Sequence, residues 1–136
     1  MNHILCAIDF SESSMHSLMW ACKISSLLHS KLEILYTYRL KPGEKELFEY
    51  RTQVEVEANR KFDAIKEEIF NRYVIPYVFR IEVGFLHDRV EARIKLRNVS
   101  FLVIGNEILN QLSLDGQGAN SKSNISSFKL PVVIVP

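Results

Sequence analysis

The chain has 136 residues, 47% of them hydrophobic, and its 17 basic and 16 acidic residues leave a formal net charge of +1. A chain of this length can bury a core without metals or disulfides, so we expect residues 1–136 to form one domain. The even charge balance gives no electrostatic reason to expect nucleic acid or an anionic membrane surface as a partner. No apolar run reaches the roughly 18 residues that span a bilayer, and residues 1–5 lack the features of a signal peptide. These observations predict a cytoplasmic protein with no nucleic acid and no membrane among its partners.

The first half of the chain predicts two strands, each followed by a helix. Residues 3–8 form a nearly continuous apolar run, which is typical of a strand covered on both faces. Ser11 is a candidate N-cap for a helix that ends near His29. Residues 32–38 have the content of a second strand, and a long charged helix is expected over residues 44–72. The apolar face of the first helix is predicted to comprise Met15, Leu18, Met19, Cys22, Ile24, Ser26, Leu27 and Leu28, and the buried stripe of the second Val54, Ala58, Phe62, Ile65, Ile69 and Phe70.

The second half continues the alternation but includes a polar stretch that we expect to be a loop. The expected elements are a strand over residues 77–85, a helix capped by Asp88 that runs to Leu96, a strand over residues 101–104 ended by Gly105, a loop over residues 106–118, a short helix near residues 120–128 and a last strand over residues 131–136.

Strands that alternate with helices predict an α/β fold in three layers, with an open parallel five-stranded sheet between helices. In such sheets, ligands bind at the carboxyl ends of the strands. Asp9, Tyr38 and Gly105 fall at predicted strand ends, so we expect them to share one region of the molecule.

The cysteines and histidines do not predict a metal centre or a disulfide. Cys6 and Cys22 lie in apolar segments and are expected to be core residues. The four histidines have no ligand spacing, and the chain contains no hydrolase elbow, zinc-protease motif or P-loop lysine motif. The serines that begin at Ser11 are open to a role as nucleophile or modification site, but helix capping is the favoured interpretation.

Four segments in order along the whole chain resemble the universal stress protein family. Residues 4–11 resemble its first strand and Asp-Phe-Ser turn, residues 35–38 the end of its second strand, residues 101–105 its fourth strand and first loop glycine, and residues 130–136 its last strand. The resemblance implies an adenine nucleotide alpha hydrolase-like fold with strand order 3-2-1-4-5. It also implies a homodimer in stress response, in which the last strands pair through Val132, Val133, Ile134 and Val135.

In nucleotide-binding members of that family, the fourth strand leads into a phosphate loop of the form G-x-x-G-(nine residues)-G-[S/T]. Gly105 and Gly118 take the positions of the first and last glycines, whereas Ile108 stands at the second glycine and Ala119 at the Ser or Thr. The register is therefore intact, but the loop is degenerate as a phosphate site. Glu107 and Asp115 would also place negative charge beside a phosphate.

The resemblance carries candidate nucleotide contacts onto this sequence, and Tyr38 is bulky enough to fill the adenine pocket itself. The candidates are Ala7, Ile8 and Asp9 near the ribose or adenine, Tyr38 near the base, and Ile104, Gly105, Gly118, Ala119 and Asn120 near the ribose and phosphates.

Two functions therefore remain open. The first is a homodimer that associates with an unknown protein partner, has no tight ATP binding and is not an enzyme. The second is a sensor that binds ATP or AMP as a cofactor, with slow ATPase activity. A catalytic domain of similar topology, such as half of an electron-transfer flavoprotein or an ATP-pyrophosphatase relative, is disfavoured because no cofactor fingerprint is present.

Overall fold

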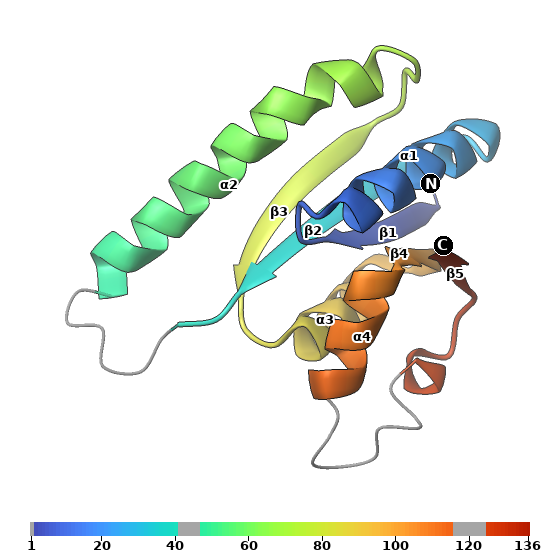
Figure 1. Cartoon of the computed structure of the whole chain (residues 1–136). Coiled ribbons are helices and arrows are strands. Elements are labelled where there is room, and N and C mark those ends of the chain that lie inside the picture. Colours follow the sequence, from blue (N-terminus) through green and yellow to red (C-terminus); the bar gives the residue numbers. More distant parts are fainter. Residues whose placement is uncertain (1, 41–46, 116–124) are drawn as a thin grey trace.

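A computed structural model describes residues 2–40, 47–115 and 125–136, which form an α/β fold with one parallel five-stranded sheet (Figure 1). The strand order is β3-β2-β1-β4-β5, and every neighbouring pair is parallel. Both the sheet and its order confirm the prediction. The elements are β1 (His3–Ile8), α1 (Glu12–Leu27), β2 (Lys31–Tyr38), α2 (Leu47–Phe70), β3 (Tyr77–Val83), α3 (Leu86–Arg97), β4 (Val99–Gly105), α4 (Asn106–Asp115), the 3-10 turn η2 (Ser126–Phe128) and β5 (Val132–Val135).

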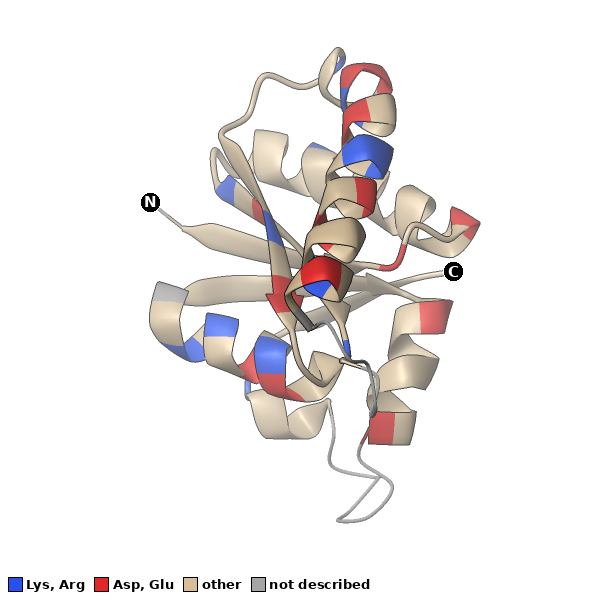
Figure 2. Cartoon of the chain, turned by 90° about the vertical axis from the view of Figure 1, so that its left-hand side faces the viewer, with Lys and Arg blue, Asp and Glu red and all other residues tan. Residues whose placement is uncertain are grey.

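The two faces of the sheet bury two separate apolar clusters, because side chains alternate along each strand. Ile4, Cys6 and Ile8 of β1 pack with residues of α1 and α2 on one face. Leu5 and Ala7 pack with residues of α3 and α4 on the other. The charged residues lie mostly on the helices and few lie on the strands (Figure 2). The sheet is therefore the middle of three layers.

Helix α1 begins as predicted, since the Ser11 side chain accepts a hydrogen bond from the Ser14 N–H at 3.1 Å. Its buried residues are mostly small, which lets the helix approach the sheet closely. They are Ser14, Ser17, Leu18, Ala21, Cys22 and Ser25. Met19, Leu27 and Leu28 were expected on this face but are 41%, 70% and 48% exposed, because the contact stripe follows the small residues and the helix ends at Leu27.

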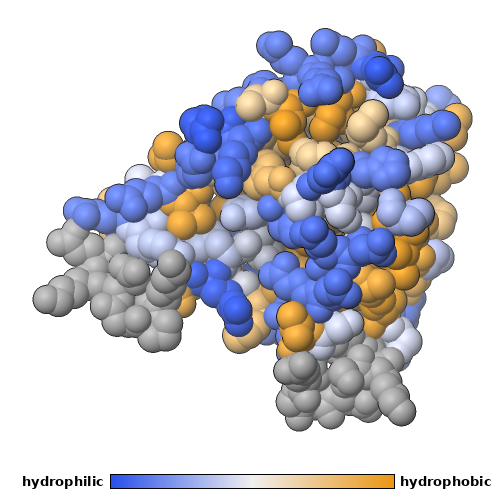
Figure 3. All heavy atoms as spheres, in the orientation of Figure 1, coloured by the Kyte–Doolittle hydropathy of each residue, from blue (hydrophilic) through white to orange (hydrophobic). Residues whose placement is uncertain are grey.

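Helix α2 presents the predicted stripe to the sheet. Ala58, Phe62 and Ile69 are buried, and Val54, Ile65 and Phe70 are half-buried. The ring of Phe62 stacks on Phe79 of β3 with 4.2 Å between the centroids. On the face drawn in Figure 3, hydrophobic residues are exposed between hydrophilic ones.

The predicted cap of α3 is wrong. The helix begins at Leu86 after Phe85, which makes no side-chain cap, and the Asp88 side chain is 70% exposed in the first turn. The carboxylate of Asp115 at the end of α4 instead accepts a hydrogen bond from the His87 N–H at 3.1 Å. A residue at the end of a different helix therefore accepts the hydrogen bond of a backbone N–H in the first turn of α3.

The predicted loop over residues 106–118 is also wrong for its first ten residues, which form α4 directly after β4. Ile108 and Leu112 are four residues apart, so both reach the core from one face of the helix, and they are 1% and 0% exposed. Of the helix expected near residues 120–128, the described part is the 3-10 turn η2.

Strand β5 lies at the edge of the sheet and pairs with β4 alone among the described strands. The side chain of Val135 is buried, whereas Ile134 is 44% exposed. Within the described ranges, no helix has the length and apolar character to cross a membrane.

Candidate functional site

Asp9 follows β1 at the carboxyl end of the central strand, where the first turn of α1 holds its carboxylate. Its Oδ1 atom accepts hydrogen bonds from the Ser11 N–H at 3.0 Å and from the hydroxyls of Ser11 and Ser14. The Ser14 oxygen in turn accepts from the Asp9 N–H at 2.8 Å. Burial acts to raise the pKa of Asp9, but the hydrogen bonds from Ser11 and Ser14 outweigh it and leave the pKa below its ordinary value. Asp9 is therefore an anion at neutral pH that ties β1 to α1.

Gly105 ends β4, next to β1 in the sheet, and its missing side chain makes room for α1. A Cβ atom at this position would overlap the Ser13 hydroxyl and lie 2.9 Å from the Ser13 carbonyl oxygen. Close approach of the backbone to α1 therefore requires a glycine here. The same position corresponds to the first glycine of the phosphate loop.

Helix α4 occupies the first ten positions after that glycine. Ile108, at the position of the second loop glycine, lies in the cluster between the sheet and α3 and α4. Asp115 bonds to the backbone of α3. Glu107 is exposed in the first turn of the helix. The described part of the segment that matches the phosphate-loop pattern is therefore helical, and Ile108 belongs to the core.

Tyr38 ends β2 and its side chain contacts α2. The phenol donates a hydrogen bond to Glu55 Oε2 at 3.3 Å, and the ring meets Tyr50 edge-on with 6.4 Å between centroids. The side chain is only 9% exposed. That Tyr38 fills an adenine pocket stays a prediction.

The described candidates gather at the carboxyl edge of three neighbouring strands, as parallel pairing requires. Asp9 lies just beyond β1, Gly105 ends β4 and Tyr38 ends β2. Ala7, Ile8 and Ile104 are at most 1% exposed, so their side chains belong to the core. The remaining candidates, Gly118, Ala119 and Asn120, lie outside the described residues.

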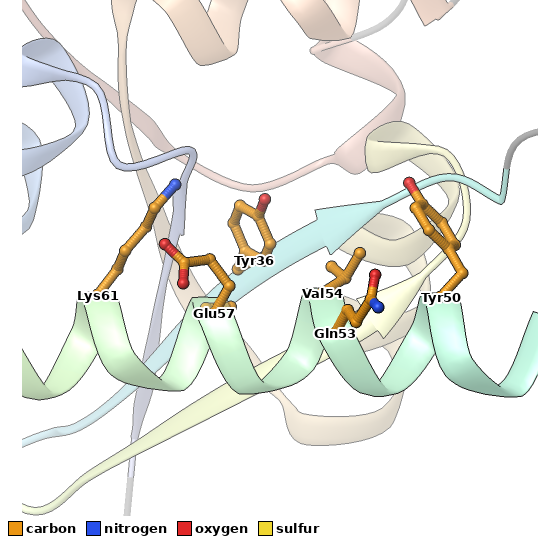
Figure 4. A pocket seen from close by; sticks show the side chains of 7 residues that line it. Tyr36, Tyr50, Gln53, Val54, Glu57 and Lys61 are labelled. Atoms are coloured by element: carbon orange, nitrogen blue, oxygen red, sulfur yellow. The ribbon is translucent and has the colours of Figure 1, made fainter.

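A pocket of about 230 Å³ lies beside this edge, between β2 and residues 50–61 of α2 (Figure 4). It is lined by Tyr36, Tyr50, Gln53, Val54, Glu57, Ala58 and Lys61. The sequence did not predict this pocket, because its residues come from two separate elements, β2 and α2. The spacing of Tyr50, Val54, Glu57 and Lys61 was an available signal, since steps of four, three and four residues share one helix face.

Phe10 connects the pocket to the Asp9 turn. The residue has a left-handed backbone, with φ of 63°, which is uncommon for a bulky side chain. Its ring lies 5.1 Å from that of Tyr36 between centroids, and the Lys61 Nζ atom stands 5.7 Å from the Phe10 centroid. Burial raises the pKa of the Tyr36 phenol, and the charge of Asp9 adds to that effect. Tyr36 is therefore a neutral hydroxyl next to an anionic turn.

The two cysteines are core residues, as predicted. Both are free thiols, and both are buried in the cluster between the sheet and α1 and α2. Burial raises the pKa of each thiol to about 12. In the described ranges, no three His, Cys, Asp or Glu side chains are grouped so as to hold a metal ion.

Solved structures of the same fold span nearly the whole chain. A protein of the universal stress protein family from Burkholderia pseudomallei is 19% identical, with a TM-score of 0.73 over 99% of this chain and 96% of its own. A universal stress protein from Archaeoglobus fulgidus in complex with dAMP is 14% identical, with a TM-score of 0.73 over 100% and 98%. A universal stress protein in complex with cAMP is 21% identical, with a TM-score of 0.63 over 98% and 95%. No family model and no curated protein sequence matches the chain. At these identities the likeness shows the fold, which is the fold of these universal stress protein structures.

Proposed function

We propose that residues 1–136 form a single universal stress protein-like domain that acts in the cytoplasm as a homodimer, by association with a partner protein and without tight ATP binding. The observation that carries this proposal is α4. The helix starts directly after Gly105 and buries Ile108 and Leu112. Unfolding this helix to form a loop would expose both side chains, at a cost of about 2 kcal/mol each.

The charge of the same segment also supports weak nucleotide binding. Residues 105–119 include Glu107 and Asp115 but no Lys or Arg. A carboxylate a few ångströms from a phosphate costs about 1 kcal/mol or more at a protein surface. The segment therefore offers a triphosphate no compensating charge of its own.

Calorimetric titration with ATP tests the proposal. We expect no binding at micromolar concentrations, either in the unmodified chain or in Ile108→Gly, which restores the family's glycine. Ile108→Gly should lower the free energy of unfolding by about 3–5 kcal/mol, since it empties a core position and adds a helical glycine. The exposed Asn110→Gly is the matched control in the same helix and should cost only about 1 kcal/mol. Micromolar binding by the unmodified chain would refute the proposal.

The homodimer is proposed to form through the edge strand β5. Its outer edge has no strand partner among the described residues, and an exposed apolar edge favours pairing with another chain. Sedimentation should show a dimer that Ile134→Lys dissociates. Val74→Lys is the control, because Val74 is fully exposed and lies between α2 and β3, outside the sheet. This variant should leave the dimer intact. A monomer of the unmodified chain at tens of micromolar would rule the dimer out.

An adenine-nucleotide sensor is the second candidate, because Asp9, Tyr38 and Gly105 meet at one edge and two similar structures were solved with dAMP and cAMP. It predicts that millimolar ATP or AMP raises the melting temperature and that Asp9→Ala removes this rise. Glu12→Ala, in the first turn of α1 beside the Asp9 turn, is the control and should keep it. If neither nucleotide moves the melting temperature of the unmodified chain, this candidate fails.

A further inference from the structure

We propose that the pocket between α2 and β2 binds a small aromatic molecule that carries one carboxylate group. No described residue of β4 or α4 lines this pocket, and the proposal does not depend on whether the chain binds ATP.

The pocket is a slot that runs along α2 and has chemically different ends. Lys61 and Glu57 lie at one end and Tyr50 at the other, with Tyr36 facing them from β2 (Figure 4). Val54 and the buried Ala58 form the apolar wall on the helix between these ends. At about 230 Å³, the slot has room for a molecule of one or two rings with a polar group at one end.

Lys61 supplies the positive charge of this slot. The carboxylate of Glu57 is already paired with Arg60, whose Nε donates to Oε2 at 3.0 Å and whose second nitrogen donates to Oε1. No carboxylate of a described residue lies within 4.0 Å of the Lys61 ammonium. The Lys61 ammonium stands over the Phe10 ring, 5.7 Å from its centroid, within reach of a cation–π contact. The charge that a ligand meets at this end is therefore positive.

The Tyr36 hydroxyl is the second polar group available to a ligand. Tyr36 is half-buried, and its hydroxyl makes no hydrogen bond to any residue in the described part of the chain. The hydroxyl is not among the buried side-chain atoms, so it is accessible from the pocket and can donate a hydrogen bond to a polar ligand. A carboxylate between the Tyr36 hydroxyl and the Lys61 ammonium would accept from both groups.

The aromatic side chains in the pocket walls favour a ligand with an aromatic ring. Tyr36 and Tyr50 present ring surface across and along the slot, and Phe10 packs behind Tyr36. Stacked or edge-to-face rings add to the free energy gained by burial of an apolar surface. A ring carrying a carboxylate therefore matches both the apolar wall and the cationic end.

Binding of 2-naphthoate, followed by protein NMR shifts and calorimetry, tests this proposal, with the uncharged 2-naphthamide as its matched ligand. We expect a dissociation constant on the order of 1 mM or tighter for naphthoate. Naphthamide should bind roughly two- to fivefold more weakly, which is the size of one exposed charge pair. Lys61→Gln should weaken naphthoate by the same factor and leave naphthamide unchanged.

Lys66→Gln is the control on the same helix, because Lys66 is paired with Asp63 at 3.2 Å and does not line the slot. It should bind both ligands as the unmodified chain does. Tyr36→Phe should weaken naphthoate more than naphthamide. The proposal is overturned by an absence of saturable shifts at about 10 mM, by equal binding of the two ligands, or by equal losses in Lys61→Gln and Lys66→Gln.

Discussion

At the carboxyl ends of β1 and β4, Asp9 and Gly105 both contact the first turn of α1. Asp9 bonds to Ser11 and Ser14, and the backbone of Gly105 approaches Ser13 too closely for any side chain. These contacts give both residues a structural role in addition to any nucleotide contact. Their effect on the stability of the fold can therefore be measured without a ligand.

The first prediction concerns Asp9 and pH. Since the folded-state pKa of Asp9 is depressed, its contribution to stability is present above the unfolded pKa of about 3.9 and is lost as the pH falls through the folded pKa. Asp9→Asn should lower the free energy of unfolding at pH 7 by about 1–2 kcal/mol. The difference from the unmodified chain should shrink below about pH 4. Urea denaturation of both proteins across this pH range measures the difference in their free energies of unfolding. A difference that stays constant with pH would contradict the role of the Asp9 charge.

The second prediction concerns the contact of Gly105 with Ser13. Gly105→Ala should destabilise the chain by about 1–3 kcal/mol through overpacking. Ser13→Ala alone should cost little, because the buried Ser13 hydroxyl has no hydrogen-bond partner in the described structure. Combined with Gly105→Ala, it should recover part of the loss by removing the overlapped atom. Additive effects in this double-mutant cycle would show that the two positions are not coupled.

At the scale of elements, the ends of the helices on one face of the sheet depend on one another. The last residue of α4, Asp115, bonds to the backbone of His87 in the first turn of α3. The α4 side chains Ile108 and Leu112 share a core cluster with Val90 of α3. Helix α4 is thus part of the packing that holds α3 on the sheet.

The third prediction separates the two acidic residues near the start of α3. Asp115→Ala should cost about 1 kcal/mol, which is typical of losing a helix N-cap. Asp88→Ala should cost only a few tenths of a kcal/mol, because its side chain is exposed and has only weak contacts, with the helix dipole and with His87 Nδ1 at 4.0 Å. Chemical denaturation compares the two, and a larger loss for Asp88→Ala would restore the cap predicted from sequence.

At the scale of the whole molecule, the sheet divides the interior into two layers, and both cysteines lie in one of them. Cys6 is at the centre of β1 and Cys22 faces it from α1, and both thiols have a pKa of about 12. Because the reactive form of cysteine is the thiolate, neither residue should react while the fold is intact.

The fourth prediction follows for thiol labelling. A disulfide reagent at pH 8 should modify Cys6 and Cys22 together, at a rate that rises with urea in step with global unfolding. Asn59→Cys, at an exposed position of α2, is the control and should add one thiol that reacts at once. Rapid modification of the native cysteines in the absence of urea would show that the core opens locally.

Several features of the fold could be predicted because their signals are short-range. The run of residues 3–8 is β1, and Ser11 caps α1, since apolar patterning and capping depend only on neighbours in sequence. Helix α4 was not predicted, although Ile108 and Leu112 have helical spacing. The segment is rich in polar residues, and the distance between Gly105 and Gly118 matches the phosphate-loop pattern, so a loop was expected. The pocket was missed because Tyr36 and the α2 residues come from different elements.

The sequence by itself determined the alternation of strands and helices, the parallel sheet and the strand ends at which Asp9, Tyr38 and Gly105 lie. Only the tertiary structure decided what those residues contact. Asp115 reaches His87 across 28 positions, and the buried Glu33 pairs with Arg80 across 47. Contacts at such separations depend on how the layers pack, which no local pattern encodes. Patterning of apolar residues therefore specified the scaffold, while packing between α1, α2, α4 and the sheet specified the chemistry at its carboxyl edge.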